Sequence, residues 1–401
     1  MSGLAWLEAL GPQRIRPGLQ RTRSLLDSLG SPDRSVRTVL VGGTNGKGST
    51  AAALSAILTA AGVRTGLYTS PHLVRVIERV RVGDADVGDA LLDDALALVA
   101  AVAGPGERGP TYFEALTVAA LELFRRARVE VAVLEVGIGG RLDATNVVGP
   151  EVSVLTNVGP DHLEILGPSL DDVAREKAGI FRRGRPALVG AEGTAPDARA
   201  VLHAEAVRLG ARLIEVPPSD RWSGTFALPG AHQRQNVALA VAAARALAPL
   251  EEAVISAGLS KTRWRGRLQR VARAGRRTLI LDGAHNPAGA EALAAWLDAE
   301  RLSGGIDLLF GALSEKDVAG TAGPLLARAR HIVLTAPPSP RAMPPEVLRE
   351  RLGVAGAETA PSPAVALRRL DVEGPGAPPV LVAGSLYLVG EVLRLLEGES
   401  G

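Results

Sequence analysis

A glycine-rich turn that carries one lysine is the first segment able to do chemistry. The turn, Gly42-Gly-Thr-Asn-Gly-Lys-Gly-Ser49, follows the apolar run Thr38–Val41 and precedes an Ala/Leu-rich stretch. Glycines let backbone N–H groups close around phosphate oxygens, and the start of a helix adds a favourable dipole. The common G-x-x-x-x-G-K-[ST] pattern is not met, because Val41 stands at the first glycine position and Gly48 follows the lysine. We interpret the turn as a phosphate-binding loop in which Lys47 reaches the outer phosphates; a turn that binds nothing is the alternative.

Three further segments place polar side chains directly after apolar runs. They are Tyr68-Thr-Ser-Pro-His-Leu73, Glu135-Val-Gly-Ile-Gly-Gly-Arg-Leu-Asp-Ala-Thr-Asn146 and Asn157-Val-Gly-Pro-Asp-His162. Ligand sites of α/β proteins form at the carboxyl ends of parallel strands, and a carboxylate beside a bound triphosphate is a natural Mg²⁺ ligand. Glu135 is therefore a candidate metal ligand. The alternatives are a capping turn for the first segment and, for Glu135, a carboxylate that caps the backbone of its own loop.

Two more segments carry candidate functional residues. Lys177 lies in Asp171–Gly179, which predicts a short acidic helix, and on spacing alone a solvated lysine paired with Glu176 is favoured. The segment Leu281-Asp-Gly-Ala-His-Asn-Pro287 again follows an apolar run and precedes a helical pattern. An Asp-Gly pair followed by His and Asn is more than a turn requires, so we expect a functional role there.

Alternating strands and helices must position these residues. Apolar runs rich in β-branched residues predict buried strands at Arg37–Val41, Glu130–Glu135, Val152–Thr156, Thr278–Leu281, Asp307–Phe310, His331–Leu334 and Pro379–Val382. Segments with helical spacing lie between several of them, for example Thr50–Ala61, Ala115–Arg126 and Ala288–Ala299. This alternation predicts an α/β fold whose parallel sheets are covered on both faces.

The alternation pauses in the Arg- and Gly-rich stretch Ser260–Arg277 and then restarts with a new strand. We place a domain boundary there. Residues 1–266 are expected to form a parallel-sheet ATP-binding domain with the phosphate loop, and residues 267–401 a smaller, Rossmann-like α/β domain. The Pro-rich stretches Pro337–Pro345 and Gly374–Pro379 are expected to be loops.

Composition narrows the class of protein. The 401 residues carry 45 Lys plus Arg against 43 Asp plus Glu, without a concentrated basic tract, so we expect no nucleic-acid partner. The absence of cysteine excludes disulfides, thiolate catalysis and Cys-based zinc sites. The first residues include Glu8 and do not resemble a secretory signal, and the longest apolar stretch, Val237–Leu250, is too short to span a bilayer. We therefore expect a cytoplasmic protein without membrane contact.

Taken in order, these segments resemble the folylpolyglutamate synthase and dihydrofolate synthase family, within the Mur ligase superfamily. The matching blocks spread over nearly the whole chain and are Gly43–Thr50, Thr69–Leu73, Thr111–Glu114, Glu135–Asn146, Asp161–Ile180, Gly230–Asn236, Arg265–Leu268, Asp282–Pro287 and Gly384–Glu391. The N-terminal Pro17–Arg21 also resembles the family's pterin-side segment. Each block alone is moderately specific, whereas the ordered set is highly specific.

The resemblance implies an ATP-dependent amide ligase. In the implied reaction, MgATP phosphorylates a carboxylate and the amino group of L-glutamate attacks the acyl phosphate, which gives an amide, ADP and phosphate. The expected acceptor is dihydropteroate, a reduced folate through its γ-carboxylate, or both, and a monomer is expected. Because phosphorylation turns a carboxylate oxygen into a leaving group, most of the protein's work is positioning and charge neutralisation.

The resemblance also implies roles for individual residues. ATP contacts are expected from Thr44, Asn45, Gly46, Lys47, Gly48, Ser49, Asn236, Arg267 and Asp282. Ligands for Mg²⁺, at two sites, are expected from Ser70, Glu135, His162 and Lys177. The pterin substrate is expected against Thr111, Phe113, Glu114, Leu142, Asp143 and Ala144, and glutamate near His285 and Ser385. The expected catalytic residues are Lys47, Lys177, Asp282 and His285.

Lys177 matches a position that is a carbamylated lysine in many of these ligases. A lysine held neutral by its surroundings can take up CO₂, and the resulting carbamate is an anionic oxygen ligand for a second Mg²⁺. Three positions depart from the family pattern. The segment Trp264-Arg-Gly-Arg267 lacks the usual proline, Gln20 stands where an acidic residue is common, and Glu315 stands where Asp is common.

Two other functions stay open. A ligase of the same superfamily for a different acid, such as a cell-wall nucleotide precursor, usually carries a separate domain for a uridine nucleotide, and the compact N-terminal region argues against it. A nucleotide-binding switch without ligase chemistry would not need Asp282, His285 and Asn286 on a second domain.

Overall fold

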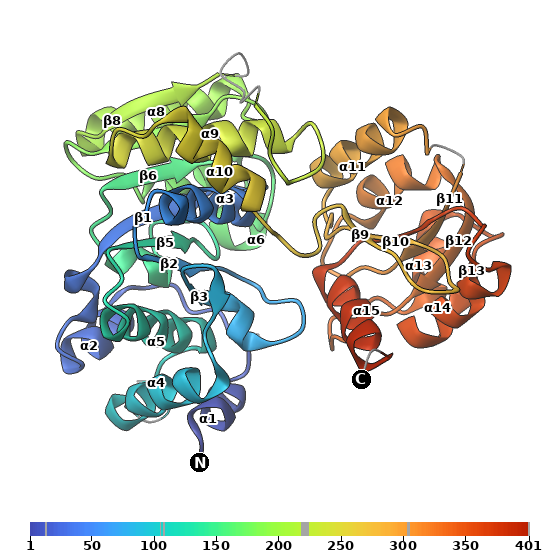
Figure 1. The fold of residues 1–401 in the computed structure, drawn as a ribbon, viewed down its shortest axis with the longest axis horizontal. Helices are drawn as coiled ribbons and strands as arrows, with labels where there is room; N and C mark the ends of the chain where they lie inside the picture. The colour runs from blue at the N-terminus through green and yellow to red at the C-terminus, as the bar shows by residue number, and fades with distance from the viewer. Residues whose placement is uncertain (13, 105, 107–108, 218–223, 303–304, 400–401) are drawn as a thin grey trace. The chain divides into compact units, whose positions relative to one another are not determined.

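The structure is a computed structural model that describes residues 1–12, 14–104, 106, 109–217, 224–302 and 305–399. It divides into two compact units (Figure 1). Unit 1 consists of Met1–Ser70, Val76–Ala227 and Gln233–Arg263, and unit 2 consists of Pro71–Arg75, Leu228–His232 and Trp264–Gly401. Each unit is an α/β structure built on one sheet, which confirms the predicted fold class.

Unit 1 contains an eight-stranded sheet with the strand order β4-β3-β2-β5-β1-β6-β7-β8. Its strands are β1 (Arg37–Gly42), β2 (Thr65–Tyr68), β3 (Val80–Val82), β4 (Ala85–Asp86), β5 (Val131–Glu135), β6 (Val152–Leu155), β7 (Pro186–Gly190) and β8 (Arg212–Val216). Strands β2, β5, β1, β6, β7 and β8 run parallel, and β3 and β4 add an antiparallel edge. The loops that follow β2, β5, β1 and β6 therefore leave neighbouring strands at the same edge of the sheet.

Helices cover both faces of this sheet. They are α1 (Gly3–Leu10), α2 (Gln20–Ser28), α3 (Lys47–Ala60), α4 (Asp89–Val102), α5 (Tyr112–Arg126), α6 (Leu163–Leu166), α7 (Leu170–Ala178), α8 (Pro196–Leu209), α9 (Gln233–Leu247) and α10 (Glu252–Lys261). Along β1, Leu40 joins a core that includes residues of α5, α7 and α8, whereas Val39 and Val41 are buried outside that cluster. Figure 1 shows α3 together with α9 and α10, which both pack on α3, on one side of β1, and α4 and α5 on the other. Strands buried on both faces explain why the sequence reads as continuous apolar runs.

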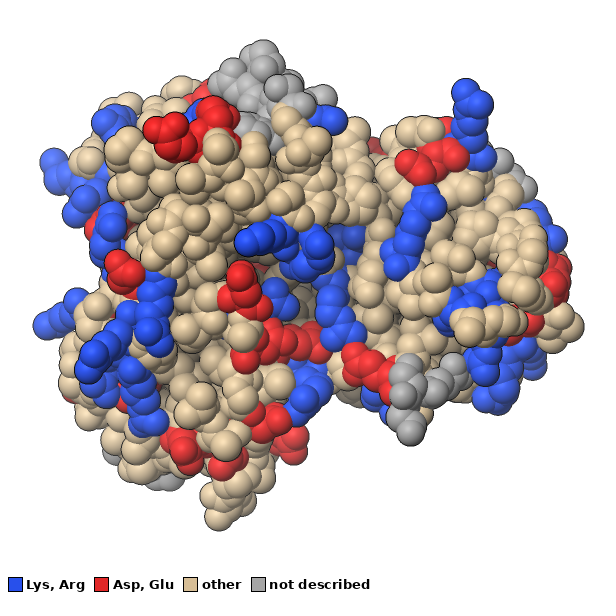
Figure 2. Space-filling model, viewed as in Figure 1, with Lys and Arg blue, Asp and Glu red and all other residues tan. Residues whose placement is uncertain are grey.

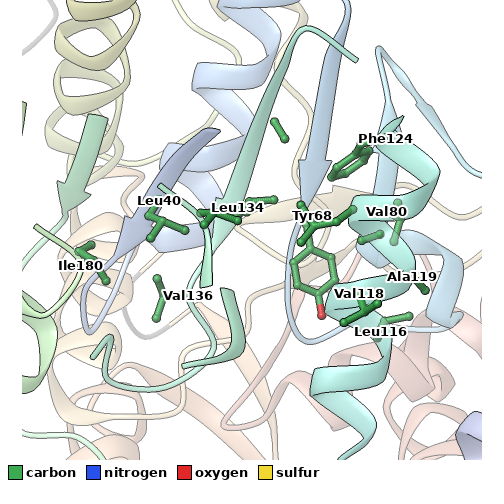
Figure 3. Packing of buried hydrophobic residues seen from close by; sticks show 14 of the residues in the cluster. Leu40, Tyr68, Val80, Leu116, Val118, Ala119, Phe124, Leu134, Val136 and Ile180 are labelled. Atoms are coloured by element: carbon green, nitrogen blue, oxygen red, sulfur yellow. The ribbon is translucent and has the colours of Figure 1, made fainter. Parts of the chain in front are cut away.

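The core between the sheet and α5 fixes the end of β2. The Tyr68 ring lies beside Leu116 and Val118 of α5 (Figure 3), and its hydroxyl group pairs with the Thr117 hydroxyl at 3.2 Å. Burial raises the pKa of Tyr68 above its ordinary value, so this hydroxyl stays neutral. A Cβ on Gly66 would lie 2.7 Å from the Phe124 ring, so glycine is required for β2 to approach α5 this closely. This packing places the segment that follows Tyr68.

Unit 2 contains a six-stranded sheet with the order β13-β12-β11-β14-β10-β9. Its strands are β9 (Gln269–Val271), β10 (Leu279–Leu281), β11 (Ile306–Phe310), β12 (Ala329–Thr335), β13 (Glu358–Ala360) and β14 (Val380–Ala383), and its helices are α11 (Pro287–Ala299), α12 (Val318–Leu326), α13 (Pro345–Leu352), α14 (Pro363–Leu370) and α15 (Leu386–Glu399). All neighbours pair in parallel except the edge strand β9. One core contains residues of α11, α12 and α13 and the other residues of α14 and α15, so this sheet is also covered on both faces.

Two short segments from elsewhere in the sequence are part of unit 2. Leu73 and Val74 pack against the core that α14 and α15 share. A Cβ on Gly390 of α15 would lie 2.0 Å from the Leu73 carbonyl oxygen, so the helix passes this segment at a distance that only glycine permits. These residues belong to Pro71–Arg75, and the second such segment is Leu228–His232.

The predicted elements are present. The seven predicted strands are β1, β5, β6, β10, β11, β12 and β14, with ends within two residues of the prediction. The three predicted helices are α3, α5 and α11, with ends within three residues, and the predicted acidic helix is α7. Of the two predicted loops, residues 374–379 form one as predicted; the other covers residues 337–344, because α13 begins at Pro345, the last residue of the predicted stretch.

Charged side chains of both signs are intermixed on the face shown in Figure 2, as the near-equal counts of basic and acidic residues indicate. Within the part of the chain that the structure describes, every helix falls short of the length and apolar character that a membrane crossing needs.

Candidate active site

The glycine-rich turn joins β1 to α3 and is shaped by two close approaches. Gly46 precedes α3 with a φ of 83°, a left-handed conformation that favours glycine, and a Cβ there would lie 2.2 Å from Asn236 Oδ1. A Cβ on Gly43 would lie 1.9 Å from Thr156 Oγ1. Glycine is required at both positions, and Asn236 of α9 lies directly against the turn.

The residues that follow β6 hold the backbone of the turn. The Thr44 N–H donates to the Asn157 carbonyl oxygen at 3.1 Å, and the Asn45 N–H donates to Asn157 Oδ1 at 2.9 Å. The Thr156 hydroxyl donates to the Asn45 carbonyl oxygen at 2.6 Å. Beyond these fixed residues, α3 begins at Lys47, and the N–H groups of a first helical turn together with the helix dipole favour an anion.

Two lysines donate to carbonyl oxygens of the turn. Lys47 Nζ lies 3.2 Å from the Thr44 oxygen, and Lys177 Nζ lies 2.9 Å from the Gly43 oxygen. Lys177 is 3% exposed. The pKa of Lys177 is lowered to about 7, mainly by burial and also by repulsion from Lys47, and attraction to Asp161 opposes both effects.

The alternative interpretation of Lys177 as a solvated, paired side chain is wrong. Lys177 is buried, and the neighbouring Glu176 pairs with Arg141 at 2.6 Å. Sequence spacing favoured a surface lysine because it cannot show that α7 lies against the phosphate loop. The structure instead gives Lys177 the surroundings in which a neutral amine is stable near pH 7.

Glu135 and Ser70 meet at the ends of adjacent strands. Glu135 is the last residue of β5 and is buried, and its Oε2 accepts from the Ser70 N–H at 3.0 Å. The carboxylate therefore caps the segment after β2. Asp143 caps the backbone of the loop after β5.

His162 follows β6 in a left-handed backbone conformation, with a φ of 52°. Its Nε2 lies 3.7 Å from Asp161 Oδ2 and its Nδ1 lies 3.5 Å from Glu164 Oε1. Across the described residues, no three or more His, Asp or Glu side chains gather into a group that could hold a metal ion. Of the predicted metal ligands, only Glu135 and His162 are of these residue types. A metal bound there would therefore need further oxygen ligands besides these two side chains.

Asp143 organises the loop after β5. Its Oδ2 accepts from the N–H groups of Gly137 and Ile138, both at 3.1 Å, and its Oδ1 accepts from the Thr145 N–H at 2.9 Å and the Thr145 hydroxyl at 2.6 Å. Burial raises the pKa of Asp143, and these donors oppose that rise. The neighbouring Leu142 and Ala144 are thereby held in place.

The start of α5 lies beside that loop. Thr111 and Glu114 form a capping box, in which the Glu114 N–H donates to Thr111 Oγ1 at 3.2 Å and the Thr111 N–H donates to Glu114 Oε2 at 2.7 Å. A Cβ on Gly137 would lie 2.8 Å from the Phe113 ring, so this ring lies over the loop after β5. The structure therefore brings together the two segments predicted to bind the pterin.

Unit 2 gathers its own predicted residues after β10. Asp282 Oδ2 accepts from the Leu268 N–H at 2.9 Å, and its Oδ1 accepts from the Ala284 N–H at 2.8 Å. A Cβ on Gly283 would lie 2.2 Å from Arg267 Nη1, so the guanidinium group lies against this turn. Arg267 and Asp282 are therefore neighbours.

His285 and Ser385 lie on the loops that follow the paired strands β10 and β14. His285 Nδ1 lies 2.8 Å from the Gly283 carbonyl oxygen, which can only accept, so Nδ1 carries a proton and Nε2 has the lone pair in the neutral ring. Ser385 Oγ accepts from the Tyr387 N–H at 3.1 Å. The Gly384 N–H donates to the Ala284 oxygen at 2.9 Å, which joins the two loops.

Two contributors were not predicted individually. Asn157 holds the phosphate loop through both its backbone and its side chain. Arg21, on α2, pairs with Glu114 at 2.7 Å. The position of Asn157 directly after a predicted strand was a usable signal, whereas nothing near Arg21 in the sequence indicates its partner 93 residues away.

Comparison with known proteins identifies the family. The Mur ligase middle domain matches residues 41–189, and the Mur ligase glutamate ligase domain matches residues 266–386. The dihydrofolate synthase/folylpolyglutamate synthase of Escherichia coli (strain K12) is 35% identical over 411 residues, which cover 99% of this chain and 95% of that protein. The chain belongs to the folylpolyglutamate synthase/dihydrofolate synthase family of Mur ligases. This confirms the resemblance seen in the sequence and the predicted class of enzyme, a ligase.

Solved structures of the same family share the fold over the whole chain. E. coli FolC in complex with DHPP and ADP has a TM-score of 0.90 at 33% sequence identity, over 100% of this chain and 99% of that one. A bifunctional folylpolyglutamate synthase/dihydrofolate synthase with Mn, AMPPNP and L-glutamate bound has a TM-score of 0.86 at 33% identity, over 99% and 98% of the two chains.

Proposed function

We propose that this ligase joins L-glutamate both to dihydropteroate and to the γ-carboxylate of reduced folates, with ATP as the phosphoryl donor. The observation that carries the proposal is the buried Lys177 against the phosphate loop, with Lys47 near enough to depress its pKa and Glu135 on a neighbouring strand end. A loop that only joined a strand to a helix would not need a buried amine beside a second lysine.

The nucleotide phosphates fit this arrangement of charge. Lys47 helps to keep the nearby Lys177 amine neutral, and Lys47 together with the first turn of α3 supplies positive potential. A triphosphate is an anion that fits this positive potential. The proposed nucleotide contacts are Thr44, Asn45, Gly46, Lys47, Gly48, Ser49, Asn236, Arg267 and Asp282.

The donor set fits Mg²⁺ with few protein ligands. Mg²⁺ commonly keeps several waters and takes one or two carboxylates together with substrate phosphates. Glu135 offers a buried carboxylate, and Ser70, held to it by a backbone hydrogen bond, offers a hydroxyl. His162 is the remaining protein ligand of the proposal. When bound, the metal would neutralise charge on the phosphoryl group that is transferred.

A second metal site requires a chemical change at Lys177. An ammonium group would repel a cation, whereas the carbamate formed from a neutral amine and CO₂ is an oxygen anion. The burial that lowers the pKa of Lys177 to about 7 keeps a large fraction of the amine neutral at physiological pH. We therefore propose that Lys177 is carbamylated in the active protein.

The chemistry proceeds in two displacements. An oxygen of the acceptor carboxylate attacks the γ-phosphorus of ATP, the bond to the bridging oxygen breaks and ADP leaves. The glutamate amine then attacks the carbonyl carbon, phosphate leaves, and the nitrogen gives up a proton. Lys47 balances charge on the transferred phosphoryl group in the first step. His285, whose Nε2 has the lone pair in the neutral ring, is the proposed acceptor of the proton in the second.

Substrate contacts divide between the two units. We assign the pterin to Thr111, Phe113, Leu142, Asp143 and Ala144 in unit 1, with Glu114 at the same turn. We assign glutamate to His285 and Ser385 in unit 2. We further propose that the protein acts as a monomer in the cytoplasm; light scattering that returns the mass of two chains would contradict the first part.

ADP release tests the proposal directly. Purified protein is given ATP, Mg²⁺ and L-glutamate with either dihydropteroate or tetrahydrofolate, and a Lys47→Ala variant serves as the control for contaminating ATPases. We expect glutamate-dependent ADP release with both acceptors and none from the variant. Turnover with one acceptor would reduce the proposal to a single reaction, and turnover with neither would refute it.

A further inference from the structure

The chain just before α2 lies against the loop that carries Leu142. Gly18, with a φ of 135°, directs its N–H toward the Leu142 carbonyl oxygen at 3.4 Å. The Arg21 guanidinium group folds back and donates from Nη2 to the Arg16 carbonyl oxygen at 2.6 Å. Residues 16–21, here called the N-terminal strap, are thus drawn into a turn that is closed by the Arg21 side chain.

The same guanidinium group holds the start of α5. Arg21 Nη2 donates to Glu114 Oε1 at 2.7 Å and Nε donates to Glu114 Oε2 at 3.2 Å. The Glu114 side chain is 4% exposed and that of Arg21 is 21% exposed. Because Oε2 also accepts from the Thr111 N–H, donors of this chain already engage both carboxylate oxygens. The contacts of Glu114 are those of a residue that organises the turn.

We propose that Arg21 is a positioning residue for the acceptor substrate, an inference that rests on the proposed function. Its planar guanidinium group donates two hydrogen bonds to the carboxylate of Glu114 and a third to the N-terminal strap. One side chain therefore joins the strap, the capped start of α5 and, through Gly18, the Leu142 loop. These are the segments to which we assign the pterin.

The phosphate loop depends on other contacts. It is fixed by Thr156 and Asn157 and by Lys177, which belong to the region after β6 and to α7. Loss of Arg21 should therefore loosen the acceptor site and leave the nucleotide site in place. This predicts a split between kinetic constants that a general loss of folding would not produce.

The test compares variants of the pair with a matched control. Arg21→Ala removes all three hydrogen bonds. Arg21→Lys keeps the positive charge but lacks the planar guanidinium group. Glu114→Gln keeps an acceptor for the Thr111 N–H and removes the negative charge. The control is Arg125→Ala, also on α5, where Arg125 donates two bonds to the buried Glu122 at 2.8 and 2.7 Å. Glu122 keeps Arg126 as a partner at 2.7 Å, so this variant removes a comparable ion pair from the other end of the helix.

For Arg21→Ala we expect the KM for dihydropteroate to rise about tenfold or more, with the KM for ATP changed by less than about twofold. Arg21→Lys should recover part of the loss, and the double variant Arg21→Ala/Glu114→Gln should be no worse than Arg21→Ala. An equal rise in the KM values for both substrates, or effects of the two substitutions that multiply, would overturn the proposal.

Hydrogen exchange gives a second readout that needs no turnover. The Gly18 N–H should exchange faster in Arg21→Ala than in the wild-type protein, and at the wild-type rate in Arg125→Ala. If the wild-type protein releases no ADP with either acceptor, the proposed function fails. Hydrogen exchange would still test whether Arg21 holds the N-terminal strap in place. Unchanged exchange at Gly18 in Arg21→Ala would refute the positioning role by itself.

Discussion

Replacing Lys177 with methionine should stabilise the protein near neutral pH while it abolishes ligase activity. Methionine keeps an unbranched, apolar side chain in the buried position and removes the amine. In the folded protein the pKa of Lys177 is lowered from 10.5 to about 7, mainly by burial. The unfolded chain therefore binds the extra proton between these two values, and the stability of the wild-type protein rises with pH across that window. The cost is fully present below about pH 7 and is gone above about pH 10.5.

The size of the effect follows from the shift. Lowering the pKa from 10.5 to about 7 costs about 5 kcal/mol when the lysine is fully protonated. About 4 kcal/mol of this remains at pH 7.5, where part of the lysine is already neutral. Loss of the hydrogen bond to the Gly43 oxygen offsets about 1 kcal/mol. We expect Lys177→Met to be about 3 kcal/mol more stable at pH 7.5, with no gain at pH 10.5.

The scarcity of lysine makes the amine directly observable. The chain has four lysines, Lys47, Lys177, Lys261 and Lys316, so lysine-selective ¹³C labelling gives four side-chain signals. The signal missing from Lys177→Met identifies Lys177, which should titrate near pH 7 in buffer without bicarbonate. With ¹³C-bicarbonate, a carbamate signal should appear in the wild-type protein and be absent from the variant.

Three results would refute this reasoning. The first is a Lys177 signal that titrates near the ordinary lysine value. The second is a Lys177→Met variant that is less stable than the wild-type protein at pH 7.5. The third is full activity in that variant, because methionine can neither accept CO₂ nor bind a metal through oxygen. Partial recovery of Lys177→Ala by bicarbonate with a short-chain acid would support the carbamate in particular.

Three further substitutions test separate parts of the account. Gly46→Ala should raise the KM for ATP about tenfold, because the new Cβ would lie 2.2 Å from Asn236 Oδ1 in a left-handed backbone, and an unchanged KM in steady-state assays would contradict this. Glu135→Gln should keep the fold and raise the Mg²⁺ concentration needed for half-maximal rate, and an unchanged Mg²⁺ titration would remove Glu135 from the ligand set. Arg277→Met should destabilise unit 2 by about 3 kcal/mol in denaturant melts, because it breaks a 2.7 Å ion pair with Asp307 in which both side chains are 1% exposed. ADP release by the folded protein should stay unchanged.

The sequence predicts the central strands well because they are buried on both faces. Strands β1, β5 and β6 read as continuous apolar runs. It misses the outer part of the same sheet. Strand β7 is buried throughout, but it begins at Pro186, ends at Gly190 and has Val189 as its one β-branched residue. Strand β8 alternates exposed and half-buried residues up to the buried Val216, so it does not resemble the apolar runs of the centre. The hairpin β3–β4 is shorter still and carries no comparable signal.

The candidate site was predicted by residue type and order, but its electrostatics were not. Lys177 and the Gly43 oxygen that it contacts are 134 residues apart, so local spacing could not reveal that this lysine is buried. The pairing of Arg21 with Glu114 across 93 residues is likewise a product of the tertiary fold. In both cases the sequence supplies the chemical group, and the packing of helices against strand ends determines its charge state or partner.

The central claim is that this chain couples ATP cleavage to the joining of glutamate to the carboxylate of dihydropteroate or of a reduced folate. The most direct test is ADP release measured with L-glutamate and either dihydropteroate or tetrahydrofolate, with omission of each substrate in turn. The account predicts release that requires glutamate and occurs with both acceptors. ADP release that does not depend on glutamate would contradict the account. So would the absence of ADP release with both acceptors.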